Sequence, residues 1–93
     1  MRSQPDDADS HNNLGEALAI QGNLNQAFSH FEQALRINPN HANAHNNLGK
    51  VFAIRRDLTN AVAHFEQALR INPDHPEAKE NLKRARAQIR KDN

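Results

Sequence analysis

The sequence predicts an all-α protein that folds as a right-handed α-solenoid of antiparallel helix hairpins. Two observations indicate this fold class: an internal repeat, and two stretches of helical apolar spacing within each copy of it. Residues 8–41 and 42–75 align without a gap, and 21 of the 34 aligned positions are identical. Similar units that recur at a fixed period form a stack in which each unit packs on its neighbours.

Each copy carries two amphipathic patterns separated by a short turn. In the first copy, Leu24, Ala27 and Phe31 follow the i, i+3, i+7 spacing that places apolar side chains on one helix face. The Asn-Pro step at residues 38–39 ends this helix, because the residue before proline is disfavoured in the helical conformation. The second copy repeats the pattern, and one further amphipathic stretch follows. We expect helices near residues 9–21, 24–37, 42–55, 58–71 and 76–91.

The turns inside the two copies differ at one informative position. Gly22 suits the left-handed backbone conformation that closes a helix, and Arg56 occupies the equivalent position in the second copy. The same conformation costs an arginine on the order of 1 kcal/mol. Asn23 and Asp57, which follow these two residues, are expected to cap the next helices with their side chains.

The predicted domain organisation has four parts. A flexible segment over residues 1–7 precedes repeats at 8–41 and 42–75, and a capping helix over 76–91 begins a third copy. Lys83 of this last helix stands where both repeats have glycine, so no further helix is expected to pack closely against it. A polar terminal helix of this kind covers the last apolar face of a repeat stack.

Several residues of the two copies match a known repeat signature. They are Leu14, Gly15, Ala27, Phe31 and Pro39, followed by Leu48, Gly49, Ala61, Phe65 and Pro73. With these residues the chain resembles tetratricopeptide repeats, whose pattern is W-x2-L-G-x2-Y…A-x3-F…P and whose period is the same. It departs from the pattern where His11 and His45 replace the tryptophan, and where Leu18 and Phe52 replace the tyrosine. The resemblance implies a non-enzymatic module with a concave groove that is lined by the first helix of each unit.

The resemblance also implies which polar residues would contact a bound peptide. The candidates are Asn12, Asn13, Glu16, Asn46, Asn47, Lys50, Asn81 and Arg84. Asn13, Asn47 and Asn81 recur at intervals of one repeat unit and are similar to the asparagine ladder of O-GlcNAc transferases. A carboxamide both donates and accepts hydrogen bonds, so such a ladder can hold the backbone of an extended peptide. The alternative interpretation is a solvated polar surface that belongs to the repeat consensus.

A second binding mode of the family does not fit these residues. Adaptors of heat-shock chaperones grip a C-terminal Glu-Glu-Val-Asp tail with lysines, an arginine and asparagines. The matching positions here are Asn12, Glu16, Asn47, Glu77 and Asn81. Of these, Asn47 alone matches, and the carboxylates of Glu16 and Glu77 would repel the tail. We therefore expect no binding of such tails.

The histidines contain one weak candidate for a metal site. His41 and His45 are four residues apart, a spacing that can place two imidazoles on one metal ion. The equivalent pairs in the other units are Asp7 with His11 and His75 with Lys79, so no complete ligand set recurs. We expect no metal and no other cofactor, and interpret the histidines as polar surface.

Composition and motifs exclude several other functions. The four hydroxyl side chains form no recognisable catalytic arrangement with a histidine and an acid, and no phosphate-binding glycine loop is present. A net charge of +1 and a basic last helix without interleaved aromatic residues argue against nucleic-acid binding. No apolar run approaches the length of a membrane span. With no signal peptide and no cysteine, the expected compartment is the cytoplasm.

The sequence therefore predicts a scaffold that binds a partner protein or extended peptide through its concave groove. Two alternatives stay open. The chain can be a self-associating module, because its acidic start and basic end suit a head-to-tail or hairpin-exchanged oligomer. It can also be a fragment of a longer array, because stacked repeats usually need about three units for stability.

Overall fold

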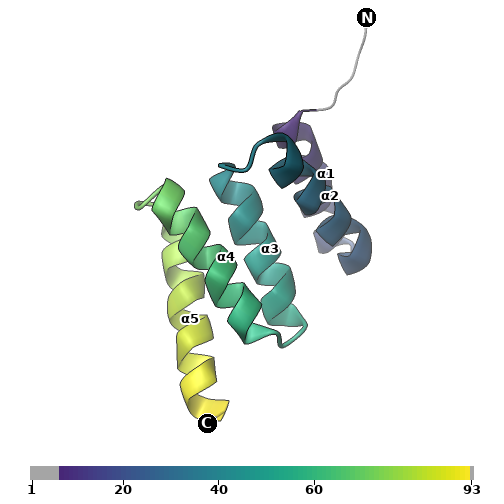
Figure 1. The fold of residues 1–93 in the computed structure, drawn as a ribbon. Helices are drawn as coiled ribbons and strands as arrows, with labels where there is room; N and C mark the ends of the chain where they lie inside the picture. The colour runs from purple at the N-terminus through teal and green to yellow at the C-terminus, as the bar shows by residue number, and fades with distance from the viewer. Residues whose placement is uncertain (1–6, 93) are drawn as a thin grey trace, which may run out of the picture.

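The computed structural model describes residues 7–92, and these residues form five α-helices without any strand (Figure 1). The helices are α1 (Ala8–Ile20), α2 (Leu24–Ile37), α3 (Ala42–Ile54), α4 (Leu58–Ile71) and α5 (Pro76–Asp92). The all-α prediction is confirmed, and every predicted helix boundary lies within one residue of the observed one. The flexible segment predicted at 1–7 lies outside the described residues, except for Asp7.

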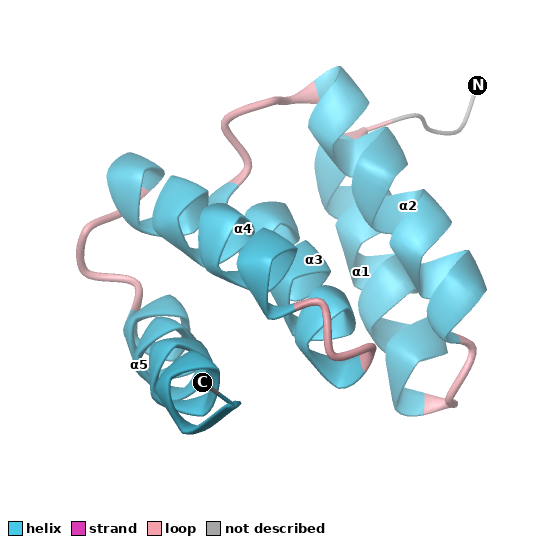
Figure 2. Ribbon diagram, turned by 60° about the horizontal axis from the view of Figure 1, so that its bottom comes forward, coloured by secondary structure: helices cyan, strands magenta, loops and turns pink. Residues whose placement is uncertain are grey.

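The helices stack along one direction as successive antiparallel neighbours (Figures 1 and 2). α1 packs chiefly on α2, and α3 packs chiefly on α4, so each repeat forms one helix hairpin. α2 contacts α3 and α4 contacts α5, which joins the hairpins into an elongated body of 53 × 28 × 18 Å. α3 also contacts both α1 and α5. The first helix of each unit therefore lies beside the first helix of the next, as in a repeat solenoid.

The apolar core consists of two junctions that are copies of each other. The first junction contains Ala27, Phe31, Leu48 and Val51, and the second contains Ala61, Phe65, Leu82 and Ala85. Each residue of the second set stands one full repeat after its counterpart in the first. Phe31 and Phe65 are both only 1% exposed, so each contributes on the order of 1.5–3 kcal/mol through burial of its ring.

Two glycines allow the helices of each hairpin to approach closely. A Cβ atom on Gly15 would lie 2.5 Å from a ring carbon of Phe31, which is far inside van der Waals contact. Gly49 has the same relation to Phe65. The Leu-Gly pair of the repeat signature is thus explained by packing, because the phenylalanine ring of the second helix lies directly over the glycine of the first.

The turns within the hairpins confirm three of the four expectations made for them. Gly22 has φ 87° and Arg56 has φ 66°, so both residues adopt the left-handed conformation. Asp57 caps α4, since its carboxylate accepts a hydrogen bond from the backbone N–H of Asn60 at 3.3 Å. The predicted cap at Asn23 is wrong, because its side chain makes no capping hydrogen bond to α2. Its carboxamide nitrogen instead donates to Gln21 at 3.4 Å.

The outer side of α1 differs from the equivalent sides of α3 and α5. Leu14 is 46% exposed, whereas its counterparts Leu48 and Leu82 are 3% and 8% exposed. The difference arises because α2 covers Leu48 and α4 covers Leu82, while no helix of residues 7–92 covers Leu14. α1 therefore presents an apolar side chain at the end of the stack.

Candidate functional site

Two hollows lie side by side along the helices that begin each unit. The first, of about 380 Å³, is formed mainly by α1 and α3, and the second, of about 330 Å³, mainly by α3 and α5. Eight of the nine residues that line the first hollow have their counterpart one repeat later in the lining of the second. The repeat in the sequence is therefore also a repeat of the binding surface.

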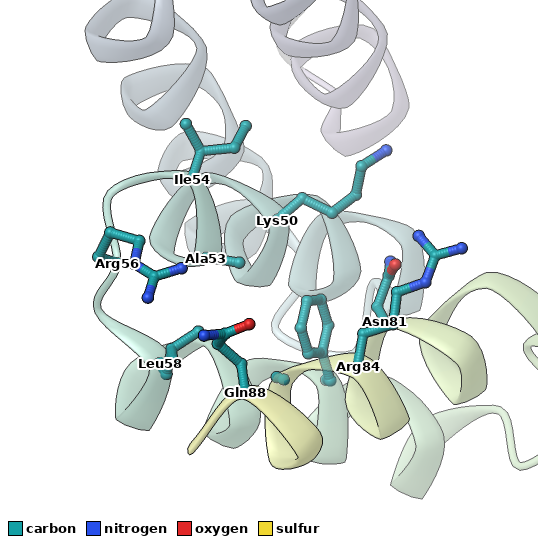
Figure 3. Close-up of a pocket in the computed structure, with 10 residues that line it drawn as sticks. Lys50, Ala53, Ile54, Arg56, Leu58, Asn81, Arg84 and Gln88 are labelled. Carbon is teal, nitrogen blue, oxygen red and sulfur yellow. The ribbon is translucent and has the colours of Figure 1, made fainter. Parts of the chain in front are cut away.

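Isoleucines form the apolar part of these hollows. Ile20 lines the first hollow and Ile54 lines both, and these residues are 87% and 61% exposed. Figure 3 shows the residues that line the second hollow, among them Ile54 and Lys50 on α3 and Arg84 and Gln88 on α5. Exposed isoleucines inside a concavity offer apolar area that a binding partner could cover.

The two hollows differ in charge. Glu16, Glu77 and Lys50 line the first hollow, whereas the charged residues that line the second are Lys50, Arg56 and Arg84. Each cation has an acidic partner. Lys50 lies 3.0 Å from Glu77, Arg84 lies 3.3 Å from Glu80, and Arg56 lies 3.4 Å from Asp92. These carboxylates lie outside the lining of the second hollow, so the charged side chains of that lining are cations that are each paired with an acidic side chain beside it.

The asparagines of the candidate groove join successive units to each other. The amide nitrogen of Asn47 donates to Asn12 at 2.8 Å and to Glu16 at 2.9 Å. In the next unit the amide nitrogen of Asn81 donates to Asn46 at 3.1 Å, which is the same bond one repeat later. Asn12, Asn46 and Asn47 are all at least 96% buried. These asparagines therefore hold the first helices of the units together.

The structure brings some of the eight candidate residues to the hollows and leaves others away from them. Five line a hollow: Glu16, Asn47, Lys50, Asn81 and Arg84. Asn12 and Asn46 are buried between helices, and the exposed Asn13 lines neither hollow. The use of the asparagines as a peptide-binding ladder stays a prediction, since two of their amide nitrogens already donate within the chain.

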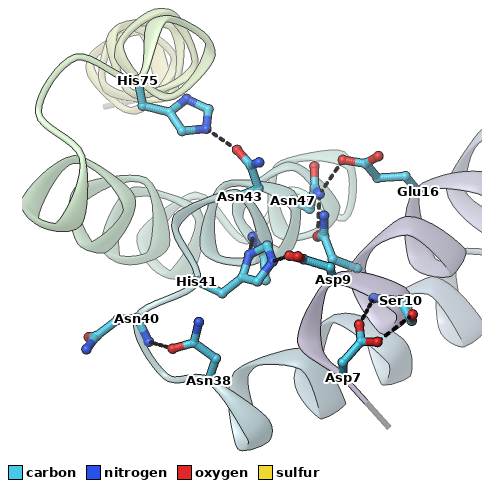
Figure 4. Close-up of polar contacts among 12 residues, drawn as sticks. Asp7, Asp9, Ser10, Glu16, Asn38, Asn40, His41, Asn43, Asn47 and His75 are labelled. Atoms are coloured by element: carbon cyan, nitrogen blue, oxygen red, sulfur yellow. Dashed lines mark hydrogen bonds and ion pairs between the residues drawn. The ribbon is translucent and has the colours of Figure 1, made fainter. Parts of the chain in front are cut away.

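A second periodic set of polar contacts begins the first helix of each unit. Asp7 caps α1, and the hydrogen bonds from Ser10 lower the pKa of its carboxyl group. His41 caps α3, where its Nδ1 accepts from a backbone N–H at 3.1 Å, and His75 does the same for α5. The Nε2 of His41 lies 2.7 Å from Asp9, which ties α3 to α1 (Figure 4). These histidines therefore have a structural use that their sequence spacing did not suggest.

The periodic groove and the repeated helix hairpins agree with a comparison against family models. A model of the tetratricopeptide repeat matches residues 6–74, well over half of the chain. The chain belongs to the tetratricopeptide-repeat family. Members of this family are generally protein-interaction modules and typically non-catalytic. A comparison with curated proteins gives no match. Within residues 7–92, no helix of this tetratricopeptide-repeat protein is long and apolar enough to cross a membrane.

The histidines that replace the signature tryptophan of the tetratricopeptide repeat form pairs. His11 stacks on His30 with 3.1 Å between their Nδ1 atoms, and His45 stacks on His64 with 3.2 Å between theirs. Each pair joins the two helices of one hairpin. Sequence reasoning missed these pairs, although the equal sequence offset within both copies was a signal that could have found them.

The contacts of His45 define where its protons lie. Its Nε2 is 2.9 Å from the carbonyl oxygen of Pro39, so this nitrogen carries a proton and donates it. In neutral His45 the Nδ1 is then an acceptor, and His64 supplies the proton that lies between the two rings. A proton added at the Nδ1 of His45 would place two N–H groups against each other and give the pair a positive charge.

His41 and His45, the weak candidate for a metal site, take part in hydrogen bonds within the chain. Both ring nitrogens of each histidine make hydrogen bonds within the chain, and the two rings contact different partners. Among residues 7–92 there is no group of three or more histidine, cysteine or acidic side chains that could hold a metal ion.

The pKa of His64 is lowered by burial of its ring and, to a smaller extent, by the nearby His45. Glu32 and Arg36 of α2 line the shallow hollow beside this ring, one of each sign. His64 is protonated at a lower pH in the folded chain than in the unfolded chain. Between the two pKa values, the unfolded state therefore binds more protons than the folded state. The stability that comes from neutral His64 is present above pH 6.5, the ordinary histidine value, and declines as the pH falls below it.

We expect His64→Phe to reduce the loss of stability between pH 7.5 and pH 5.5. Phenylalanine keeps a ring beside Phe52, on which His64 stacks at 5.5 Å, but it cannot be protonated. Urea unfolding followed by circular dichroism at several pH values measures the free energy of unfolding for both chains. The other five histidines are present in both proteins, so only the group at position 64 differs. Equal pH slopes for wild type and variant would contradict this assignment.

Proposed function

We propose that this tetratricopeptide-repeat protein binds a partner polypeptide through the two hollows on its α1, α3 and α5 side. The observation that carries the proposal is that the residues lining the first hollow recur, one repeat later, in the lining of the second hollow. A repeated surface suits a polymer that presents similar groups at regular intervals, and a polypeptide is such a polymer. The family to which the chain belongs supports the same conclusion.

The exposed isoleucines supply the apolar part of the proposed binding energy. Full burial of an isoleucine side chain is worth roughly 1.5–3 kcal/mol, and Ile54 is shared by both hollows. The carboxamide of Asn81 lines the second hollow and can bond to a partner's backbone. Apolar anchors with a few convergent polar groups are the usual composition of a binding concavity.

We expect Ile54→Asn to abolish the capture of the protein's specific partners with little loss of stability. Residue 54 ends α3 and is 61% exposed, so the substitution removes apolar area from the groove without opening the core. Ile37→Asn is the matched control, because Ile37 ends α2, is 46% exposed and lines neither hollow. Affinity capture from native lysate, with quantitative mass spectrometry, compares the partners of the three proteins.

The pattern of retention decides the proposal. Partners that wild type and Ile37→Asn retain, and that Ile54→Asn loses, support binding through the groove. Partners that all three proteins retain equally would contradict it. Thermal unfolding of both variants shows that each is folded in the comparison.

Self-association is the second candidate function. It is favoured by Leu14, which is 46% exposed at the end of the stack where the other units are covered. A second copy that covered α1 would make the apparent mass depend on concentration. Light scattering over a wide concentration range measures this mass, and a constant monomer mass would remove the candidate.

A further inference from the structure

The last helix of the stack carries four cations along one face, namely Lys79, Lys83, Arg86 and Arg90. They stand at i, i+4, i+7 and i+11, a spacing that places all four side chains on the same side of α5. Together with Leu69 of α4 and Leu82 of α5, they line a hollow of about 290 Å³, the basic hollow. None of its residues lines either hollow of the groove, so it is a separate surface.

The equivalent face of α3 is covered by the second helix of its own hairpin. There His45 and Phe52 both contact the ring of His64, and Phe65 lies over Gly49. In α5 the three equivalent positions are cations. Among residues 7–92, α5 contacts only α3 and α4, so no second helix covers this face (Figure 2).

Most of the charge in the basic hollow is not neutralised by the described chain. Arg86 lies 2.6 Å from Glu66 of α4, and the other three cations are exposed and form no ion pair with any of residues 7–92. The three acidic side chains of α5 pair with cations outside the basic hollow, and none of them lines it. A ligand carboxylate therefore meets three cations for which it need not compete.

The composition of the basic hollow favours an acidic polypeptide over other anions. Leu69 and Leu82 provide apolar surface that an apolar side chain can cover but a phosphate group cannot. No aromatic residue lines the hollow, so bases of a nucleic acid would find no ring to stack on. The cations extend over about 16 Å of helix, a length that carboxylates at the same helical spacing can match.

Lys83 determines how closely a partner helix can approach. In the repeats the equivalent residue is glycine, and even a Cβ atom on Gly49 would meet the ring of Phe65. A lysine at this position excludes a ring packed in the same way. A helix bound here therefore lies farther out than the second helix of a hairpin, at a distance that long lysine, arginine and glutamate side chains can span.

We propose that the basic hollow binds an acidic amphipathic helix of a partner protein, with carboxylates along one face and an apolar side chain beside them. The carboxylates pair with Lys79, Lys83 and Arg90. The apolar side chain covers Leu69 and Leu82. This inference does not rest on the proposed function, because the basic hollow and the groove share no residue.

The test uses the full chain and two fluorescent, alanine-based helical peptides of about twenty residues. In the first peptide, glutamates stand at i, i+4, i+7 and i+11, with a leucine at i+3 beside them. The second has the same composition, but its glutamates are distributed around the helix. Fluorescence anisotropy measures both dissociation constants. The first peptide is expected to bind roughly fivefold more tightly, because it alone can place several carboxylates against the cations at once.

Charge reversal at Lys83 tests where the first peptide binds. Lys83→Glu is expected to weaken its binding roughly tenfold, because an attraction is replaced by a repulsion. Lys91→Glu is the matched control, since it makes the same charge change at an exposed lysine of α5 outside the basic hollow. A peptide in which glutamine replaces the leucine is expected to bind wild type several-fold more weakly. Circular dichroism shows that both variants are folded.

The inference is overturned if Lys83→Glu and Lys91→Glu lose the same affinity, or if the two peptides bind equally, because net charge alone would then explain the attraction. Vesicles of equimolar phosphatidylcholine and phosphatidylserine, and a DNA duplex, are the competing ligands. Tighter binding of either, lost in Lys83→Glu but not in Lys91→Glu, would assign the hollow to phosphate groups and also overturn it. Absence of binding by all these probes overturns it and leaves the cations as a solvated surface.

Ile54→Asn separates this inference from the proposed function. The substitution alters the groove and is expected to leave the affinity for the first peptide unchanged, since residue 54 does not line the basic hollow. Loss of peptide binding in Ile54→Asn would place the peptide in the groove and overturn the inference. The capture of partners by Ile54→Asn and Ile37→Asn decides the proposed function independently.

Discussion

Gly49→Ala is expected to destabilise the protein by about 2–3 kcal/mol, which is within the usual cost of overpacking a well-filled core. In an ordinary helix interior, replacing glycine with alanine stabilises by about 0.5–1 kcal/mol. Here the new Cβ would lie 2.6 Å from a ring carbon of Phe65. That ring is 1% exposed and packs among Ala61, Leu82 and Ala85, so moving it away from the new methyl group would disturb these contacts. Urea unfolding followed by circular dichroism measures the change.

A double variant separates this clash from other effects of the substitution. Phe65→Leu removes the ring atoms that the alanine would meet, at the cost of a cavity. The combined variant is therefore expected to lose less stability than the sum of the two single changes. A Gly49→Ala protein as stable as wild type would show that the two helices can separate without cost, and would contradict the explanation of the Leu-Gly signature.

Asn47→Ala is expected to lower the free energy of unfolding by about 2 kcal/mol, because it leaves a buried acceptor without its donor. The amide nitrogen of Asn47 bonds to Asn12, which is 3% exposed and cannot be reached by water. Glu16 loses the same donor, but it is exposed and can be hydrated instead. Alanine recovers part of the loss through its higher helix propensity, roughly 0.5 kcal/mol.

Asn13→Ala is the matched control for this change. Asn13 occupies the equivalent position one repeat earlier, but it is exposed, so alanine there should leave stability unchanged or slightly raised. Thermal and urea unfolding of both variants compares the two positions. Equal changes in the free energy of unfolding for the two variants would show that the hydrogen bond between Asn47 and Asn12 contributes nothing to stability. The comparison also matters for binding experiments, because a loss of affinity in Asn47→Ala would mix a binding effect with a change in folding.

Much of the fold follows from local patterns in the sequence. The spacing of Leu24, Ala27 and Phe31 and the Asn-Pro step define where helices run and end, because these effects act within one or two turns of helix. The fixed period of the two copies orders the hairpins without any knowledge of distant contacts. The misassigned cap at Asn23 is also local, but its carboxamide could bond to the helix or to a neighbouring side chain, and sequence does not rank these options.

The candidate site was only partly predictable. Glu16, Lys50 and Arg84 line the hollows as their helical positions indicated. Asn12 and Asn46 were assigned to the same face, yet they are buried between units. A position near the edge of a helix face can point into the groove or into the next helix, and the distance between helix axes decides which. The distance between two helix axes cannot be read from the spacing of apolar and polar residues along one helix.

By itself, the sequence determined the repeat, the five helices, their order and the family, since all of these depend on periodicity and local backbone preference. Only the tertiary structure decided which polar side chains bond across units, that His45 stacks on His64, and that similar hollows form at two successive junctions. The physical reason is that these features depend on the approach of helices to within a few ångströms. Gly15 and Gly49 permit that approach, and the rings of Phe31 and Phe65 set its limit.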